Sequence, residues 1–297
     1  MRATVAFVLS VAVSASRGCH ALLLARPIMT SHRLIPATAA AAKKASAMPY
    51  RLSRPASMVD ASEPDLVLAG SKLIYFGIPG RGEAVRLALA IGGVPFEDKR
   101  VPFPAWGKVK PTTPWGTLPV LELADGSQLA QARSVLRFVG QYTGLYPSDP
   151  LVAARVDELM DALEDLDAAI TNTGKCLPKD EQETARLAAV SEGGAVYNLL
   201  AKIDAFIQVH GTAGYAVGAG MTIASILTFT CLGRIVGGVF YGVPPTVCDT
   251  FPNIQAVRKT VGNDPAVVAW CDARVEQQKS LKSLSPAEQV LVGCRDL

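Results

Sequence analysis

Two kinds of side chain in this sequence could carry chemistry: its cysteines and a tyrosine inside a short apolar run. The cysteines form no Cys-x-x-Cys pair and no Cys-His ligand pattern, and they stand at positions 19, 176, 231, 248, 271 and 294. No zinc or other metal site and no disulfide framework is therefore expected, and the pattern favours free thiols in a reducing compartment. Tyr75 remains. Its hydroxyl can donate a hydrogen bond to an anionic atom, or it can simply meet water from a half-buried strand.

The elements around Tyr75 alternate between strand and helix. β-branched and aromatic runs bounded by Gly and Pro predict strands, and apolar residues at helical spacing predict helices. Strands are expected at 73–76, 96–101, 118–123 and 128–130, and helices at 81–91 and 134–142. This order is typical of a thioredoxin-like α/β domain, here placed at residues 70–145.

Two features of this domain bear on its chemistry: a missing cysteine pair and a proline at the start of a strand. Disulfide exchange needs Cys-x-x-Cys after the first strand, where this chain has Ile78-Pro79-Gly80-Arg81. Disulfide exchange and a cysteine-based, glutaredoxin-like role are therefore excluded. Pro119 lies near the start of a strand, which predicts a cis bond between Leu118 and Pro119.

The residues from Lys72 to Arg86 resemble the N-terminal motif of the glutathione transferases that use tyrosine, nearest the sigma class. Further matches in register cover about residues 70–275: Trp106, Lys110, Trp115-Gly-Thr-Leu-Pro-Val-Leu-Glu, Leu129-Ala-Gln131, Leu145-Tyr-Pro, Arg155-Val-Asp-Glu-Leu-Met-Asp-Ala-Leu-Glu-Asp and Pro265-Ala-Val-Val-Ala-Trp270.

The resemblance implies that Tyr75 is the catalytic hydroxyl. A thiol with a pKa near 8.5 is mostly protonated at neutral pH, and a donor held against the sulfur stabilises the reactive thiolate. Glutathione is the implied co-substrate. The resemblance implies that Arg81 and Trp106 flank its glycyl and cysteinyl region and that Lys110 binds the glycine carboxylate. It also implies that the main chain of Leu118, beside cis Pro119, pairs with the cysteinyl backbone and that Gln131 binds the γ-glutamyl end.

Ala132 departs from the family pattern, which usually has Ser at this helix N-terminus. The backbone N–H and the helix dipole remain for the γ-glutamyl carboxylate, but the loss of the hydroxyl weakens binding by about 1 kcal/mol. Arg133 could compensate or could face solvent. Asp165 matches an acid that reaches the glutathione ammonium across a dimer interface, with Asp161 and Glu164 as competitors, and a plain acidic helix face is the alternative.

Residues 151–275 predict an all-helical bundle domain. Helical spacing runs over 152–170, 181–209, 222–239 and 254–275, interrupted by Gly and Pro. Thr222 fits a helix cap, with Met221 and Ile226 as its hydrophobic staple. The family's usual Asp is replaced by Ser225, a weaker reciprocal acceptor. No role is assigned to the tail at 276–297.

The second substrate is expected to be a small hydrophobic electrophile. The resemblance places its pocket at Ile78, Val101, the helix ends near 171–176 and the 228–241 region. Trp115 lies where several classes carry an aromatic residue that docks into a partner subunit. A homodimer is therefore expected, with a buried intrachain tryptophan as the alternative.

The first 66 residues are typical of a targeting leader that is removed. They hold eight of the 29 Lys and Arg but three of the 26 acids, so the remaining chain carries 21 basic and 23 acidic residues. A basic, nucleic-acid-binding body is thus excluded, and no apolar run is long enough to span a membrane. An apolar stretch after Arg2, followed by an acid-free segment to Val59, predicts a signal and a transit peptide in sequence. Import into a plastid is expected; a mitochondrial leader or a cytoplasmic protein with a misplaced start are the alternatives.

The sequence therefore predicts a glutathione transferase that conjugates hydrophobic electrophiles or reduces organic peroxides. Two alternatives stay open. One is a glutathione-dependent isomerase resembling prostaglandin D synthase, and the other is a non-catalytic, ligand-binding or structural relative.

Overall fold

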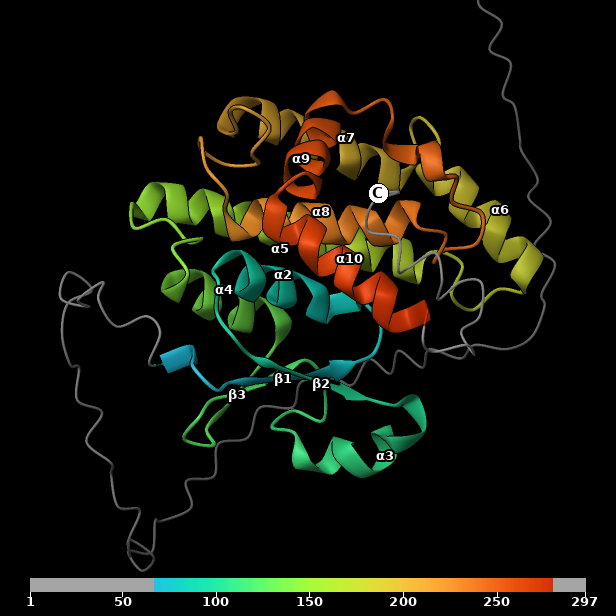
Figure 1. Cartoon of the computed structure of the whole chain (residues 1–297). Coiled ribbons are helices and arrows are strands. Elements are labelled where there is room, and N and C mark those ends of the chain that lie inside the picture. The colour runs from blue at the N-terminus through green and yellow to red at the C-terminus, as the bar shows by residue number, and fades with distance from the viewer. Residues whose placement is uncertain (1–66, 280–297) are drawn as a thin grey trace, which may run out of the picture. The chain divides into compact units, whose positions relative to one another are not determined.

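The computed structural model describes residues 67–279 (Figure 1). The predicted leader at 1–66 and most of the predicted tail lie outside the described residues. The last described helix continues to Lys279, four residues beyond the expected end of the helical domain at 275.

The first half of the described chain is a four-stranded sheet with helices on both faces. Its elements are β1 (Lys72–Phe76), α2 (Glu83–Ile91), β2 (Glu97–Val101), α3 (Trp106–Val109), β3 (Val120–Glu122), β4 (Gln128–Ala130) and α4 (Ala132–Tyr142). The strand order is β2-β1-β3-β4, with β1 parallel to β2 and the other pairs antiparallel. Figure 1 shows α2 and α4 on the face toward the second half and α3 on the other face. The predicted thioredoxin-like fold is confirmed.

The strand that carries Tyr75 lies inside this sheet. Leu73, Ile74 and Tyr75 are all buried, because β1 is flanked by β2 and β3 and covered on both faces. The predicted cis bond between Leu118 and Pro119 is present, directly before β3.

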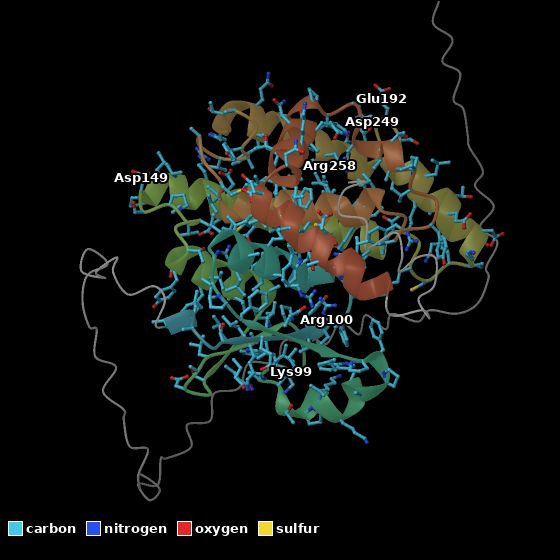
Figure 2. All side chains as sticks on the ribbon, viewed as in Figure 1. Lys99, Arg100, Asp149, Glu192, Asp249 and Arg258 are labelled. Atoms are coloured by element: carbon cyan, nitrogen blue, oxygen red, sulfur yellow. The ribbon has the colours of Figure 1, made fainter. Side chains whose placement is uncertain are left out.

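The second half is a helical bundle. Its helices are α5 (Pro150–Asn172), α6 (Lys179–Val190), α7 (Ala195–His210), α8 (Ile223–Val236), α9 (Pro252–Gly262) and α10 (Pro265–Lys279). The expected helical stretch at 181–209 divides into α6 and α7, because the chain turns at Gly193 with φ of +80°. Asp149 starts α5 by accepting hydrogen bonds from the backbone N–H groups of Leu151 and Val152 (Figure 2).

The central helix of the bundle is α8. It packs against α5, α9 and α2, and every one of its residues is buried except Leu227 and Arg234. A helix that is apolar on nearly all sides belongs in a core. Within residues 67–279, no helix combines the length and apolar character needed to cross a lipid bilayer.

The start of α8 confirms one part of the predicted cap and changes another. Thr222 is the N-cap, and its hydroxyl accepts from the N–H of Ser225 at 3.4 Å. The Ser225 hydroxyl accepts from the N–H of Ala216 at 3.0 Å. Ser225 thus fastens the preceding loop to α8, and its hydroxyl also lies 3.4 Å from the Thr222 hydroxyl, whereas a capping box would bond it to the backbone N–H of the cap residue.

Candidate functional site

The Tyr75 hydroxyl is buried and already accepts a hydrogen bond. The backbone N–H of Arg81 donates to it at 2.9 Å, and the side chain is only 6% exposed. Because the oxygen accepts from this N–H, its own proton is available for a further acceptor. Burial raises the pKa of Tyr75, an effect opposed by the Arg81 N–H and by the charges of Arg234 and Arg86. The group is therefore a protonated hydrogen-bond donor at neutral pH, suited to stabilising an anion and unsuited to acting as a base.

Two glycines make room for the Tyr75 ring. A Cβ at Gly80 would lie 2.4 Å from the hydroxyl oxygen, and a Cβ at Gly82 would lie 2.6 Å from ring carbons. Gly80 also has φ of +43°, a conformation that favours glycine. The sequence indicated Gly80 as the end of a strand and Gly82 as part of a helix; their close approach to Tyr75 gives both a specific function.

Gly82→Ala is expected to lower kcat on the order of tenfold, since the added methyl displaces the ring from the reacting sulfur. Gly220→Ala is the matched control, because a Cβ there meets nothing within 4 Å. Steady-state kinetics on both variants checks the expectation. Equal kcat values for the two would show that the ring tolerates the displacement.

A buried ion network holds the loop that follows Tyr75. Arg86 donates to the carbonyls of Phe76 and Ile78 at 2.9 and 2.8 Å, and its guanidinium lies 5.5 Å from the Tyr75 ring centroid. It also pairs with Glu83 at 3.1 Å and Asp98 at 2.9 Å. The position of Tyr75 is therefore set by a charged side chain as well as by the sheet.

The same network reaches the last helix. Arg274 of α10 pairs with Glu83 at 2.6 Å and donates to the Gly77 carbonyl at 3.4 Å, while Trp270 donates to Glu83 at 3.1 Å. The side chains of Glu83, Arg86 and Arg274 are at most 3% exposed. Burial alone would raise the pKa of Glu83, but the charges of Arg274 and Arg86 outweigh it and lower the pKa. Glu83 is therefore ionised at neutral pH.

The ends of three strands bring Tyr75 and four of the eight predicted glutathione-binding residues to one edge of the sheet. Tyr75 lies at the end of β1, and Pro119 precedes the antiparallel β3, whose ladder with β1 stops at the Ile74–Val120 pair. The main chain of Leu118 therefore lies beyond the paired residues. Ala130 ends β4 opposite Val120, so Gln131 and Ala132 follow at the same edge.

Gln131 has a strained backbone at this edge. Its φ of +72° and ψ of +108° are uncommon for a residue with a side chain, and such strain concentrates at functional sites. The conformation starts α4 at Ala132, and no side chain caps the N–H groups of its first turn within the described residues. Arg133 does not face this edge: it donates to the Met160 carbonyl at 3.1 Å and pairs with Asp161 at 3.0 Å.

Trp106 and Lys110 lie on the α3 side of the sheet. The Trp106 ring meets Phe76 edge-to-face at 5.6 Å, and Phe76 stacks on the exposed Phe103 at 4.7 Å. Lys110 is exposed and forms no ion pair with any of the described residues. It therefore remains available to a carboxylate.

The three acidic candidates on α5 differ in their partners. Asp161 pairs with Arg133 and Arg137, and Glu164 pairs with Arg81 at 2.7 Å. Asp165 is exposed and has no ion-pair partner within residues 67–279.

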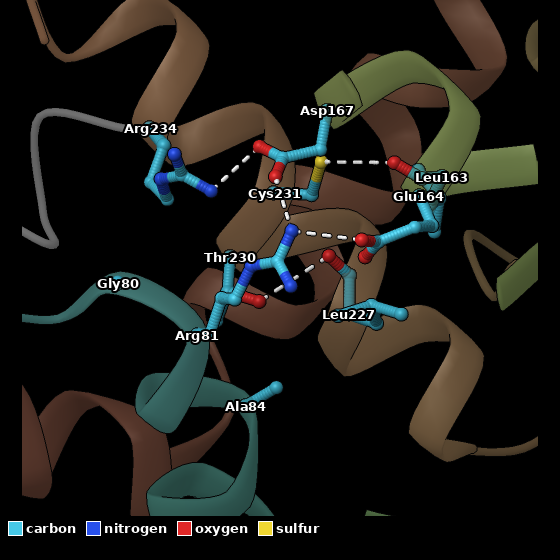
Figure 3. Close-up of a pocket in the computed structure, with 10 residues that line it drawn as sticks. All are labelled: Gly80, Arg81, Ala84, Leu163, Glu164, Asp167, Leu227, Thr230, Cys231 and Arg234. Atoms are coloured by element: carbon cyan, nitrogen blue, oxygen red, sulfur yellow. Dashed lines mark hydrogen bonds and ion pairs between the residues drawn. The ribbon is translucent and has the colours of Figure 1, made fainter. Parts of the chain in front are cut away.

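The side chain of Arg81 extends into the second half of the molecule. Its guanidinium pairs with Glu164 at 2.7 Å and Asp167 at 3.3 Å, and Asp167 also pairs with Arg234 of α8 at 2.6 Å (Figure 3). The backbone of Arg81 thus serves Tyr75, whereas its side chain joins α5 and α8.

These groups line a cavity of about 40 Å³ between α2, α5 and α8. Its lining includes Leu227, Thr230, Cys231 and Arg234, which belong to or adjoin the predicted 228–241 region. Ile78, Val101 and the 171–176 segment do not line it. Four of the ten lining residues are charged, and the other six are apolar or small side chains.

Comparisons with known proteins cover both halves of the described chain. A family model described as the glutathione S-transferase N-terminal domain matches residues 71–141, and one for the glutathione S-transferase C-terminal domain matches residues 169–274. Glutathione S-transferase 1 of Ascaris suum is 35% identical over 52% of this chain and 75% of its own length. Hematopoietic prostaglandin D synthase of Gallus gallus is 29% identical over 68% of this chain and 96% of its own. A solved prostaglandin synthase D structure from Nilaparvata lugens superposes with a TM-score of 0.62 at 27% identity, covering 69% of this chain and 98% of that one.

Proposed function

Because this chain belongs to the glutathione S-transferase family, we propose that it conjugates glutathione to small electrophiles, with the Tyr75 hydroxyl stabilising the thiolate. One observation carries the proposal. The hydroxyl is buried, remains protonated and already accepts from the Arg81 N–H, so its single proton is free for a sulfur placed at the sheet edge.

The binding groups follow from the same edge. The main chain of Leu118 beside Pro119 pairs with the cysteinyl backbone, and the first turn of α4 at Gln131 and Ala132 receives the γ-glutamyl carboxylate. Lys110 supplies the cation for the glycine carboxylate. Trp106 lies against the glycyl and cysteinyl region of glutathione. Asp165 binds the ammonium group of the glutathione in the partner subunit.

The reaction needs no further catalytic group for its first step. Loss of the thiol proton to solvent gives a thiolate held by the Tyr75 proton, and its sulfur then forms a bond to the electrophilic carbon. A leaving group departs with the displaced electron pair, or a conjugated carbonyl takes the electrons and then a proton. Reduction of organic peroxides would use the same thiolate.

The pKa of bound glutathione tests this directly. We expect thiolate ultraviolet absorbance at neutral pH in the complex, with a midpoint at least one pH unit below that of the free thiol near 8.5. Turnover of chlorodinitrobenzene should accompany it. A protein that binds glutathione with an unshifted thiol pKa and no turnover would contradict the proposal.

A glutathione-dependent isomerase is the second candidate, favoured by the match to hematopoietic prostaglandin D synthase over nearly that protein's whole length. It uses the same thiolate but regenerates glutathione. Thiol consumption separates the two: conjugation removes one thiol per turnover, whereas isomerisation removes none.

We also propose a homodimer, supported by Trp115, whose side chain is 69% exposed on the surface of the described chain. Sedimentation equilibrium measures the oligomeric state, and a monomer at micromolar concentration would refute the dimer.

We propose that residues 1–66 direct import into a plastid. A fluorescent reporter fused behind residues 1–66 would refute it by remaining in the cytosol.

A further inference from the structure

The face of α8 that lines the cavity ends in an arginine. Leu227 and Arg234, the two residues of α8 that are not buried, stand seven residues apart on one face, with Thr230 and Cys231 between them. All four line the cavity that Gly80 and Arg81, the neighbours of the Tyr75 hydroxyl, also line. Arg234 is therefore the charged end of the wall that the second half of the molecule offers to a substrate.

Much of the hydrogen-bonding capacity of Arg234 is unused. Its guanidinium has five N–H donors, and the described residues show one hydrogen bond from it, from Nη1 to Asp167 at 2.6 Å. Its side chain retains 21% exposure. A neighbouring anion could thus be bound without breaking the pair with Asp167.

A second arginine, Arg186, contacts the same aromatic ring as Arg234. The buried Phe240 ring has Arg234 at 5.7 Å and Arg186 of α6 at 5.5 Å from its centroid. Arg186 is 7% exposed, its Nε has no hydrogen-bond partner, and it forms no ion pair within the described residues. Its charge is not neutralised locally.

Two arginines and two acids line the cavity, and the acids are shared with a further arginine outside it. Glu164 and Asp167 are shared among three arginines, since Asp167 pairs with Arg81 and Arg234 while Glu164 pairs with Arg81 and, at 3.9 Å, with Arg133. Arg186 adds a further positive charge behind Phe240. Arg81 is held by both acids, whereas Arg234 is held by Asp167 alone and keeps unused N–H donors for a ligand.

We propose that the second-substrate site selects electrophiles that carry a carboxylate, with Arg234 as the specificity-determining residue and Leu227 and Thr230 beside it on the same wall. This deepens the proposed function and rests on it. The carboxylate binds the unused N–H groups of Arg234, which are suited to a planar anion, and the reactive carbon lies toward Tyr75.

Two aryl chlorides with the same substitution pattern test the inference: a chlorodinitrobenzoate and the corresponding chlorodinitrobenzamide. Wild-type enzyme should prefer the benzoate in kcat/KM by about tenfold, chiefly through a lower KM. Arg234→Met should remove this preference, measured as the ratio of kcat/KM for the two substrates. Arg234→Lys should restore part of it, and Arg186→Met should reduce it by about twofold.

The ratio of the two substrates isolates charge recognition from structural damage. Arg234 also influences Tyr75 and Asp167, but those effects change both substrates equally and cancel in the ratio. Arg155→Met, which removes an arginine from a surface pair with Glu158, should leave the ratio unchanged. Equal losses for both substrates in Arg234→Met, or a wild-type preference for the benzamide, would overturn the inference.

Failure of the proposed function would look different, as absence of turnover with both substrates. Calorimetry with unreactive dinitrobenzoate and dinitrobenzamide, in the presence of glutathione, then decides the inference alone. Tighter binding of the benzoate that is lost in Arg234→Met supports it, and equal binding of the two overturns it.

Discussion

Tyr75→Phe is expected to lower kcat/KM for chlorodinitrobenzene by about two to three orders of magnitude, the loss typical of removing one donor to a developing or resting anion. The ring, its packing against Gly80 and Gly82 and the position of Arg86 are all retained. The loss should therefore appear in kcat, with glutathione affinity little changed, because the peptide ends of glutathione bind elsewhere on the sheet edge.

The pH profile gives an independent measurement. A donor lowers the pKa of the bound thiol, so the wild-type rate rises with pH and levels off above that lowered pKa. In Tyr75→Phe the inflection should move up toward the ordinary thiol value near 8.5. Because burial raises the pKa of Tyr75 above its ordinary value, the wild-type rate should not fall through deprotonation of this group below about pH 10.

Tyr197→Phe is the matched control. Its ring packs on Phe251 at 5.2 Å in the helical half, and its hydroxyl forms no hydrogen bond with any described residue. It should leave both rate and pH profile unchanged. An unshifted inflection in Tyr75→Phe would show that another group stabilises the thiolate.

Arg274→Met is expected to lower the free energy of unfolding by about 3–5 kcal/mol, because it leaves the buried carboxylate of Glu83 with one of its two cationic partners. For a domain pair of this size, that corresponds to a melting temperature lower by roughly 10 °C. Chemical and thermal denaturation measure both quantities.

Acid stability should change in a defined direction. The pKa of Glu83 is lowered in the folded protein, so its ion pairs stabilise the fold above the unfolded-state pKa, near 4.3, and this contribution is lost as pH falls through the folded-state pKa. Removing Arg274 raises the folded-state pKa. The variant should therefore unfold in acid at a higher pH than the wild type.

A double-mutant cycle separates this pair from general damage. The double variant Glu83→Gln with Arg274→Met should lose less free energy of unfolding than the sum of the two single losses. Each single change leaves the other member of the buried pair charged without its partner, whereas the double change removes both charges. Arg155→Ala, in an exposed pair with Glu158, should cost at most about 1 kcal/mol. Strict additivity at Glu83 and Arg274 would contradict a coupled network.

The sequence indicated the fold well because its signals are local. Strand and helix order, the cis bond before Pro119 and the cap at Thr222 each depend on a few neighbouring residues. The division of 181–209 into two helices was less evident, because its cause is a single turn with Gly193 in a left-handed conformation. Within the site, Tyr75, Pro119 and Gln131 could be placed at one sheet edge from their register alone.

What the sequence could not show depends on distant pairing of charges. Nothing local distinguishes Glu83 and Arg274, which are separated by 191 positions, from the many solvated charges on other helices. Arg81 was predicted to line the glutathione site, but its side chain is attracted across to Glu164 and Asp167. The pairing of Arg234 with Asp167 was also not evident, because Arg234 sits in an otherwise apolar helix and its partner lies 67 positions away.

The pairing of Glu83 with α10 also sets an order of events during protein synthesis. The first domain leaves the ribosome with Arg86 and Glu83 in place, but Arg274 and Trp270 emerge only when nearly the whole chain has been made. We expect nascent chains that stop before residue 265 to remain sensitive to protease around Tyr75. Chains long enough for α10 to have left the ribosome should become resistant. The last helix would thus complete the first domain.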